Sequence, residues 1–156
     1  MRTGKAQQAD ADRRSFFARQ IQTFGEKMKR LTNEILQRFP EVAPSVFEGD
    51  EELPYVMMGH LSHWVLSQVK TGPAPGLISR IKEFSKWCET QPRGENASDD
   101  IWTIYVVGFH EEMFEDEKTR SIIPTLATRQ ELLDNRDYLI AWVGWQAYED
   151  ALKKFK

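Results

Sequence analysis

Three histidines come closer than any other residues of this chain to the spacing of a metal site. His60 and His63 lie three positions apart, so on a helix both side chains would face the same way. His110, followed by Glu111, would supply further ligands if the fold brought it near. Because a catalytic zinc site uses three protein ligands and a water molecule, one hypothesis is a metal-binding enzyme or sensor. The chain lacks a His-Glu-x-x-His motif and paired cysteines, and ordinary packing of an amphipathic helix explains the pair beside Trp64 better.

Nucleophilic catalysis has little support in the sequence. The single cysteine, Cys88, follows Trp87 on an apolar helix face, and nothing nearby supplies a base or a positive charge, so we interpret it as a buried core residue. No serine lies in a Gly-x-Ser-x-Gly elbow. The glycine-rich segment 72–76 lacks the Gly-Lys-Ser/Thr ending of a phosphate loop and follows a helix rather than a strand. The sequence therefore predicts no catalytic residue and no cofactor.

The densest group of carboxylates follows His110. It consists of Glu111, Glu112, Glu115, Asp116 and Glu117. General acids or bases need burial to shift their pKa values, and five carboxylates within seven residues cannot all be buried. Solvation is the simplest interpretation. The sharper hypothesis is an electronegative patch that binds a basic partner and speeds its association.

Aromatic residues support an interface less directly. Five tryptophans and nine phenylalanines exceed what a small core requires, and Trp102, Trp142 and Trp145 lie on helices with wide apolar faces. Core packing is the favoured interpretation. The alternative is an exposed ring that anchors a partner, for which Trp145 is the candidate.

Apolar periodicity predicts a single-domain, all-α bundle of about six helices, which would form a short stack of antiparallel helical hairpins. The predicted helices cover residues 10–39, 54–71, 77–91, 101–109, 118–133 and 135–155. Residues 1–9 are predicted to be a flexible tail and residues 10–156 the domain. The stretch 101–109 also has the β-branched and aromatic content of a strand, but no other run could pair with it, so we predict a central buried helix.

The first predicted helix carries one long apolar stripe. Its members alternate between spacings of four and three: Phe17, Ile21, Phe24, Met28, Leu31, Ile35 and Phe39. We expect this stripe to dock on its own domain. The alternative is a coiled-coil seam, which would make the chain a dimeric regulatory domain.

Charge is distributed unevenly along the chain. Residues 1–40 carry nine Lys/Arg and four Asp/Glu, whereas residues 41–156 carry twelve and twenty, a balance of −8. An acidic body argues against a nucleic-acid partner, because phosphates are bound by clustered cations. The basic first helix is expected to lie against the acidic body of its own fold. No apolar run is long enough for a membrane span, no secretory signal is visible, and a lone cysteine fits a reducing compartment, so we expect a cytoplasmic protein.

Several short motifs resemble a family of uncharacterised bacterial all-helical domains. They are Phe39-Pro40-Glu41, Leu53-Pro54-Tyr55-Val56 with the nearby Gly59, and an aliphatic central helix that closes on Glu111 and Glu112. The resemblance covers residues 15–150 and implies a helical fold without assigned catalytic residues. Small helical domains of this kind look similar to the immunity proteins encoded beside bacterial toxins.

These observations lead to one principal hypothesis. We expect a non-enzymatic protein-interaction domain, in its most specific form an immunity-type inhibitor that binds and neutralises a basic toxin. The alternatives are the metal-binding enzyme or sensor and the dimeric regulatory domain.

Overall fold

The chain is helical throughout the part that the structure describes. A computed structural model describes residues 3–72 and 75–156, and no strand occurs in these ranges. The predicted all-α class is therefore confirmed. The elements, in chain order, are α1 (Thr3–Arg38), η1 (Pro40–Ser45), η2 (Asp50–Glu52), α2 (Pro54–Thr71), α3 (Leu77–Thr90), α4 (Ile101–Tyr105), η3 (Val106–His110), α5 (Glu111–Glu115), α6 (Glu117–Arg120), α7 (Ile123–Leu126), α8 (Arg129–Asp134), α9 (Arg136–Val143) and α10 (Trp145–Lys153). None of the described helices combines the length and the apolar content that a membrane span requires.

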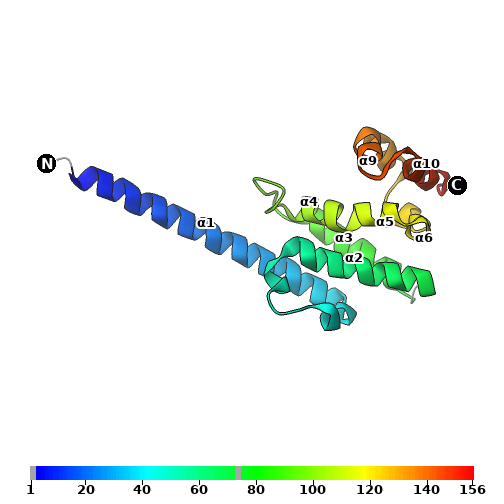
Figure 1. The fold of residues 1–156 in the computed structure, drawn as a ribbon, viewed down its shortest axis with the longest axis horizontal. Coiled ribbons are helices and arrows are strands. Elements are labelled where there is room, and N and C mark those ends of the chain that lie inside the picture. Colours follow the sequence, from blue (N-terminus) through cyan, green and yellow to red (C-terminus); the bar gives the residue numbers. More distant parts are fainter. Residues whose placement is uncertain (1–2, 73–74) are drawn as a thin grey trace.

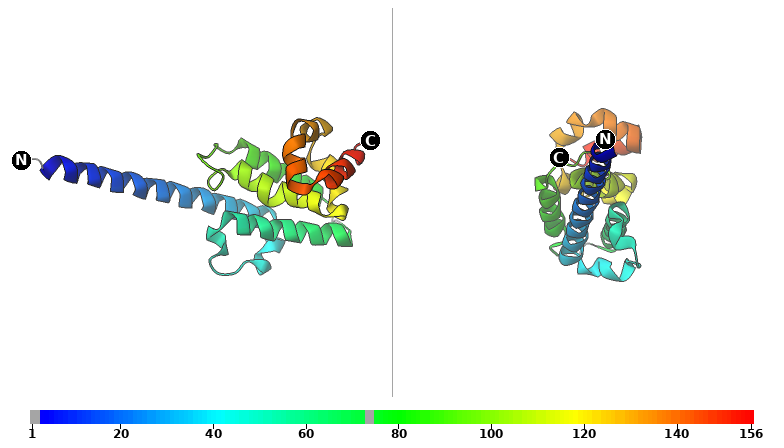
Figure 2. Two further views of the ribbon diagram at one scale, coloured as in Figure 1. Left: turned by 45° about the horizontal axis from the view of Figure 1, so that its top comes forward. Right: turned by 90° about the vertical axis from the view of Figure 1, so that its left-hand side faces the viewer.

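Helix α1 is longer than the body that it joins. Its C-terminal part lies beside α2, whereas its N-terminal part projects away from every other element (Figures 1 and 2). Only the second half of the predicted stripe enters the core: Met28, Leu31, Ile35 and Phe39 are buried. The first half does not: Phe17 and Phe24 are exposed by 59% and 38%, and the neighbouring Phe16, outside the stripe, is exposed by 58%. The expectation that the whole stripe docks on its own domain is thus wrong for residues 3–27, which we call the arm.

Two predictions about the N-terminus concern residues at the limit of the described part. Residues 3–9 were assigned to a tail, but they form the first turns of α1. Residues 1–2 and the side chain of Ile21, which belongs to the predicted stripe, lie outside what the structure describes.

Proline and glycine set most helix boundaries. Pro40 follows the last turn of α1, and Pro54 occupies the first turn of α2. Gly144, at φ +88°, separates α9 from α10, so the single helix predicted over 135–155 is in fact two. Most residues with a side chain avoid that region of φ, whereas glycine enters it without a steric penalty. The helix predicted over 118–133 is likewise divided, into α6, α7 and α8.

Helices α4, η3 and α5 form one continuous helix at the centre of the body (Figure 1). The helical interpretation of residues 101–109 is confirmed. Its N-cap is Asp100, whose carboxylate accepts hydrogen bonds from the backbone N–H and the hydroxyl of Thr103. The middle turn, η3, is a π-helical turn, which is wider than an α-helical turn.

An aromatic stack runs through the core. The ring of Phe84 on α3 contacts Phe39 edge-on at 5.7 Å and Tyr105 edge-on at 6.0 Å between centroids. Tyr105 is in turn stacked on Trp102 at 5.4 Å and on Phe109 at 5.5 Å. Phe39, Phe84, Tyr105 and Phe109 are at most 1% exposed, so these rings join α1, α3 and the central helix in a single dry cluster. Cys88 is buried in the same core, as predicted.

Because α1 is divided between core and arm, we expect two truncations of its side chains to change the free energy of unfolding by very different amounts. Ile35→Ala should lower the free energy of unfolding by roughly 2–5 kcal/mol, because it leaves a cavity among buried side chains. Phe17→Ala, in dilute protein, should change it by less than about 0.5 kcal/mol. Urea denaturation followed by circular dichroism measures both values, and equal losses would show that the arm packs on its own domain.

Gly108 predicts a second pair of effects. A Cβ atom at this position would lie 2.7 Å from Cγ and 2.9 Å from Cβ of Met58 on α2. Gly108→Ala should therefore destabilise the fold by roughly 1–3 kcal/mol through overpacking. Gly59→Ala is the matched control, because nothing lies within 4 Å of that Cβ, and it should stabilise the helix by about 0.5–1 kcal/mol. Thermal denaturation compares the two, and a neutral Gly108→Ala would contradict the close approach of η3 to α2.

Candidate functional site

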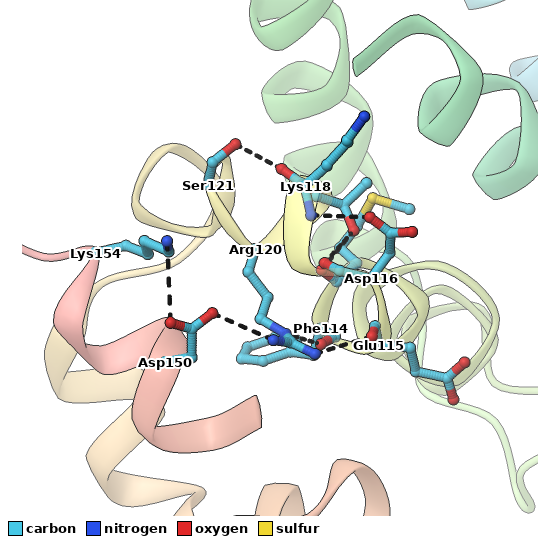
Figure 3. Close-up of polar contacts among 10 residues, drawn as sticks. Phe114, Glu115, Asp116, Lys118, Arg120, Ser121, Asp150 and Lys154 are labelled. Carbon is cyan, nitrogen blue, oxygen red and sulfur yellow. Dashed lines mark hydrogen bonds and ion pairs between the residues drawn. The ribbon is translucent and has the colours of Figure 1, made fainter. Parts of the chain in front are cut away.

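The acidic segment 111–117 does not form one electronegative patch. Glu111 is fully buried and Asp116 is half-buried, whereas Glu112, Glu115 and Glu117 are exposed. The chain bends sharply within this segment, where α5 ends and α6 begins (Figure 3). Three of the five predicted carboxylates therefore remain available to a partner.

Arg120 holds the bend in place. Its Nε donates a hydrogen bond to the carbonyl oxygen of Phe114 at 2.6 Å, and one terminal nitrogen donates to that of Glu115 at 3.0 Å. The other terminal nitrogen forms an ion pair with Asp150 on α10 at 3.2 Å (Figure 3). The guanidinium thus closes the end of α5 and attaches α10 to it.

Asp116 has a structural role as the N-cap of α6. Its carboxylate accepts a hydrogen bond from the backbone N–H of Lys118 at 2.8 Å and forms an ion pair with Lys70 on α2 at 3.1 Å. The backbone donor, followed by the lysine, lowers the pKa of this carboxyl. Because the Asp116 carboxylate already binds a backbone N–H and a lysine, it would contribute little to the binding of a partner.

Glu111 is the only described glutamate that is fully buried. Its Oε1 accepts a hydrogen bond from the hydroxyl of Tyr138 on α9, and its Oε2 has no partner in the described part of the chain. Burial, partly opposed by this hydrogen bond, raises the pKa of Glu111. Burial and the nearby carboxylate also raise the pKa of Tyr138 to about 12. The pair links the central helix to α9.

The structure does not bring the three histidines together. His60 lies 2.7 Å from the carboxylate of Asp50 through its Nε2. His63 is exposed on the same helix, where it partly opposes the rise of the Glu112 pKa that burial and Glu115 cause. His110 stacks against Tyr105, at 6.1 Å between ring centroids. In residues 3–72 and 75–156, no group of three or more His, Cys, Asp or Glu side chains is placed to hold a metal ion.

Trp145 is 50% exposed, in keeping with the anchor hypothesis rather than with core packing. Two other large rings of the same region, Tyr138 and Trp142 on α9, are 47% and 51% exposed. They lie four residues apart, on one face of the helix. The guanidinium of Arg136 lies over the Trp145 ring, 5.3 Å from its centroid. Tyrosine, tryptophan and arginine are the residues enriched at the energetic centres of protein interfaces.

One pocket gathers residues that the sequence analysis did not connect. It has a volume of about 620 Å³, within the usual range for small-molecule sites, and lies between α3, the central helix, α7, α8 and α9. Trp102, Tyr105 and His110 line it from the central helix. The local sequence signal was only a run of aromatic residues, which is equally typical of a core.

No family model, curated protein or solved structure matches the chain. The resemblance to bacterial helical domains therefore remains a prediction.

Glu111 predicts a pH-dependent stability. Because its pKa is raised in the folded state, ionisation costs stability as the pH rises above the unfolded value of 4.5. Glu111→Gln removes this cost and retains an acceptor for Tyr138, so at neutral pH it should stabilise the fold by about 1 kcal/mol. The gain should shrink toward zero below pH 4.5, where the carboxyl is protonated in both states. Urea denaturation across this pH range measures the effect, with the exposed Glu48→Gln as the control. A gain that is independent of pH would contradict the raised pKa.

Proposed function

We propose that this chain is a protein-interaction domain that associates with a second copy of itself by placing its arm on the body of the partner. The observation that carries the proposal is the projection of residues 3–27 from the body with three exposed phenylalanines. A helical segment whose described side chains are mostly exposed gains little from tertiary packing, which is the main source of helix stability in proteins. A surface that covers the phenylalanines would supply that packing.

The apolar contribution is large enough for a specific complex. Full burial of one phenylalanine side chain contributes roughly 1.5–3 kcal/mol. The three phenylalanines of the arm are 38–59% exposed, so covering each one would contribute about half of that value. For the six phenylalanines of two reciprocally exchanged arms, the summed free energy still exceeds the lower estimates of the entropic cost of association. We expect a dissociation constant on the order of micromolar.

The charges of the chain indicate which surface of a second copy the arm covers. They favour the body of that copy over its arm. Residues 3–27 carry five Lys/Arg and three Asp/Glu, whereas residues 28–156 carry fifteen and twenty-one. Two arms repel each other weakly, but arm and body attract. The arm points away from its own body (Figure 2), so in this proposal the body that it covers is that of a second molecule. A reciprocal exchange of this kind closes as a two-fold dimer.

The proposal predicts that the arm controls the oligomeric state. Sedimentation velocity at micromolar concentrations should show a dimer for the wild-type chain. The triple variant Phe16→Ser/Phe17→Ser/Phe24→Ser should be monomeric with an unchanged core, because these side chains are exposed. High salt should weaken the dimer, because it screens the attraction between arm and body.

Phe47→Ser is the matched control. This phenylalanine is 75% exposed but lies in the loop after η1, outside the arm, so the variant should dimerise like the wild type. A wild-type chain that stays monomeric, or a triple variant that still dimerises, would refute the proposal. A dimer that tightens with salt would show that the arms pair with each other instead.

A second candidate function is the binding of a basic protein partner. The acidic body and the exposed rings of Tyr138, Trp142 and Trp145 favour it. Together with Glu112, Glu115 and Glu117, these residues offer aromatic anchors and negative charge to a basic protein. Its most specific form is the immunity-type inhibitor of a basic toxin. Burial of Glu111 and the capping role of Asp116 remove two carboxylates from the surface on which that prediction rested.

A further inference from the structure

The pocket of about 620 Å³ is independent of the arm and of the acidic segment. Five elements contribute to it: α3, the α4–η3 part of the central helix, α7, α8 and α9. It is lined on the inside by the aromatic stack of the core and on the outside by charged residues of α3 and α8. Its size suits a small organic molecule.

The π-helical turn shapes the inner wall. Val106 and His110, the first and last residues of η3, both line the pocket, as does Trp102 one turn earlier. Gly108, within the same turn, lies against Met58 of α2 instead. The wider turn thus places two side chains in the pocket while its glycine lets α2 approach. Turns of this kind occur most often at functional sites.

One buried polar group of the inner wall has no hydrogen-bond partner, and beside it the half-buried imidazole of His110 forms no hydrogen bond to a described residue. The hydroxyl of Tyr105 is buried and makes no hydrogen bond to any described residue, although Ser85 lies near enough to oppose slightly the rise of the Tyr105 pKa caused by burial. The imidazole of His110 contacts Tyr105 and Phe114 only through its ring faces and edges. Burial lowers the pKa of His110 to about 4, so at neutral pH it offers one donor and one acceptor. Unsatisfied buried groups are uncommon in proteins and call for a physical explanation.

The rim carries two lysines that can meet a negative charge. Lys82 and Lys86 are four residues apart on the same face of α3, and neither forms an ion pair with a described residue. The opposite rim has Glu131, but this carboxylate is engaged in the capping box of α8, where it accepts hydrogen bonds from Thr128. Glu89, three residues beyond Lys86 on α3, also lines the pocket, so the α3 side carries two ammonium groups and one carboxylate, which leaves a net positive charge.

From this arrangement we propose that the pocket binds a small planar aromatic carboxylate. The aromatic ring lies against Trp102 and Val106, and the carboxylate meets Lys82 and Lys86. The neutral imidazole of His110 hydrogen-bonds to a polar atom of the ligand. Each part of the ligand thus has a complementary group in the pocket. Its ring packs on an aromatic side chain, its carboxylate pairs with the lysine ammonium groups, and a polar atom hydrogen-bonds to the imidazole.

Cinnamate tests the proposal, with cinnamyl alcohol and cinnamylamine as probes of the same shape and different charge. Calorimetric titration of the full chain should show binding of cinnamate, and the tryptophan fluorescence should change, because Trp102 lines the pocket. Binding of the alcohol should be about tenfold weaker, since it lacks the charge that the lysines meet. Lys82→Gln/Lys86→Gln should weaken cinnamate binding about tenfold and leave the affinity for the alcohol unchanged.

Variants of the inner wall separate binding from folding. His110→Phe keeps the ring contacts with Tyr105 and Phe114 but removes both hydrogen-bonding nitrogens, so it should weaken cinnamate several-fold. Thr32→Val is the control: it loses a hydrogen bond to the carbonyl oxygen of Glu51, and because neither residue lines the pocket, it should bind cinnamate as the wild type does. Absence of cinnamate binding, equal binding by the lysine variant, or tighter binding of cinnamylamine would overturn the proposal.

Discussion

The contact on which the rest of the structure depends is the stacking of aromatic rings around Tyr105. Phe84 joins this ring to Phe39 at the end of α1, and Trp102, Phe109 and His110 surround it from the central helix itself. The core and the inner wall of the pocket are therefore two sides of one cluster. Stability and ligand binding are coupled through it, because a molecule that binds only the folded chain also stabilises that fold.

Local sequence signals were enough to predict most helices and several of their ends. Pro40, Pro54 and the break at residues 72–76 separate the helices where the structure has their ends, and the lack of any pairing partner for residues 101–109 identified a helix. Gly144 was harder to interpret, because a single glycine is tolerated within a helix and only its positive φ ends one here. The stripe of α1 has the same periodicity whether it meets its own core or another molecule, so its exposed half was not distinguishable in advance.

The candidate site was less accessible to sequence reasoning because it depends on tertiary placement. Glu111 resembles its acidic neighbours in the sequence, yet it lies on the inward face of the central helix, opposite Tyr138. The pocket gathers side chains from distant segments, and no spacing rule connects Lys82 with Trp102 or Glu131. Trp145 shows the reverse case: it is the first residue of α10, directly after Gly144, and the residues of this helix that enter the core are Ala147, Tyr148 and Ala151 instead.

The π-helical turn also sets the direction of every side chain that follows it in the central helix. A turn of this kind holds one residue more than an α-helical turn. Removing that residue would restore a regular helix and rotate everything after it by about a quarter of a turn. Phe84 and Phe39 lie outside the central helix and would keep their contact, whereas the side chains that follow the turn would lose their present orientation.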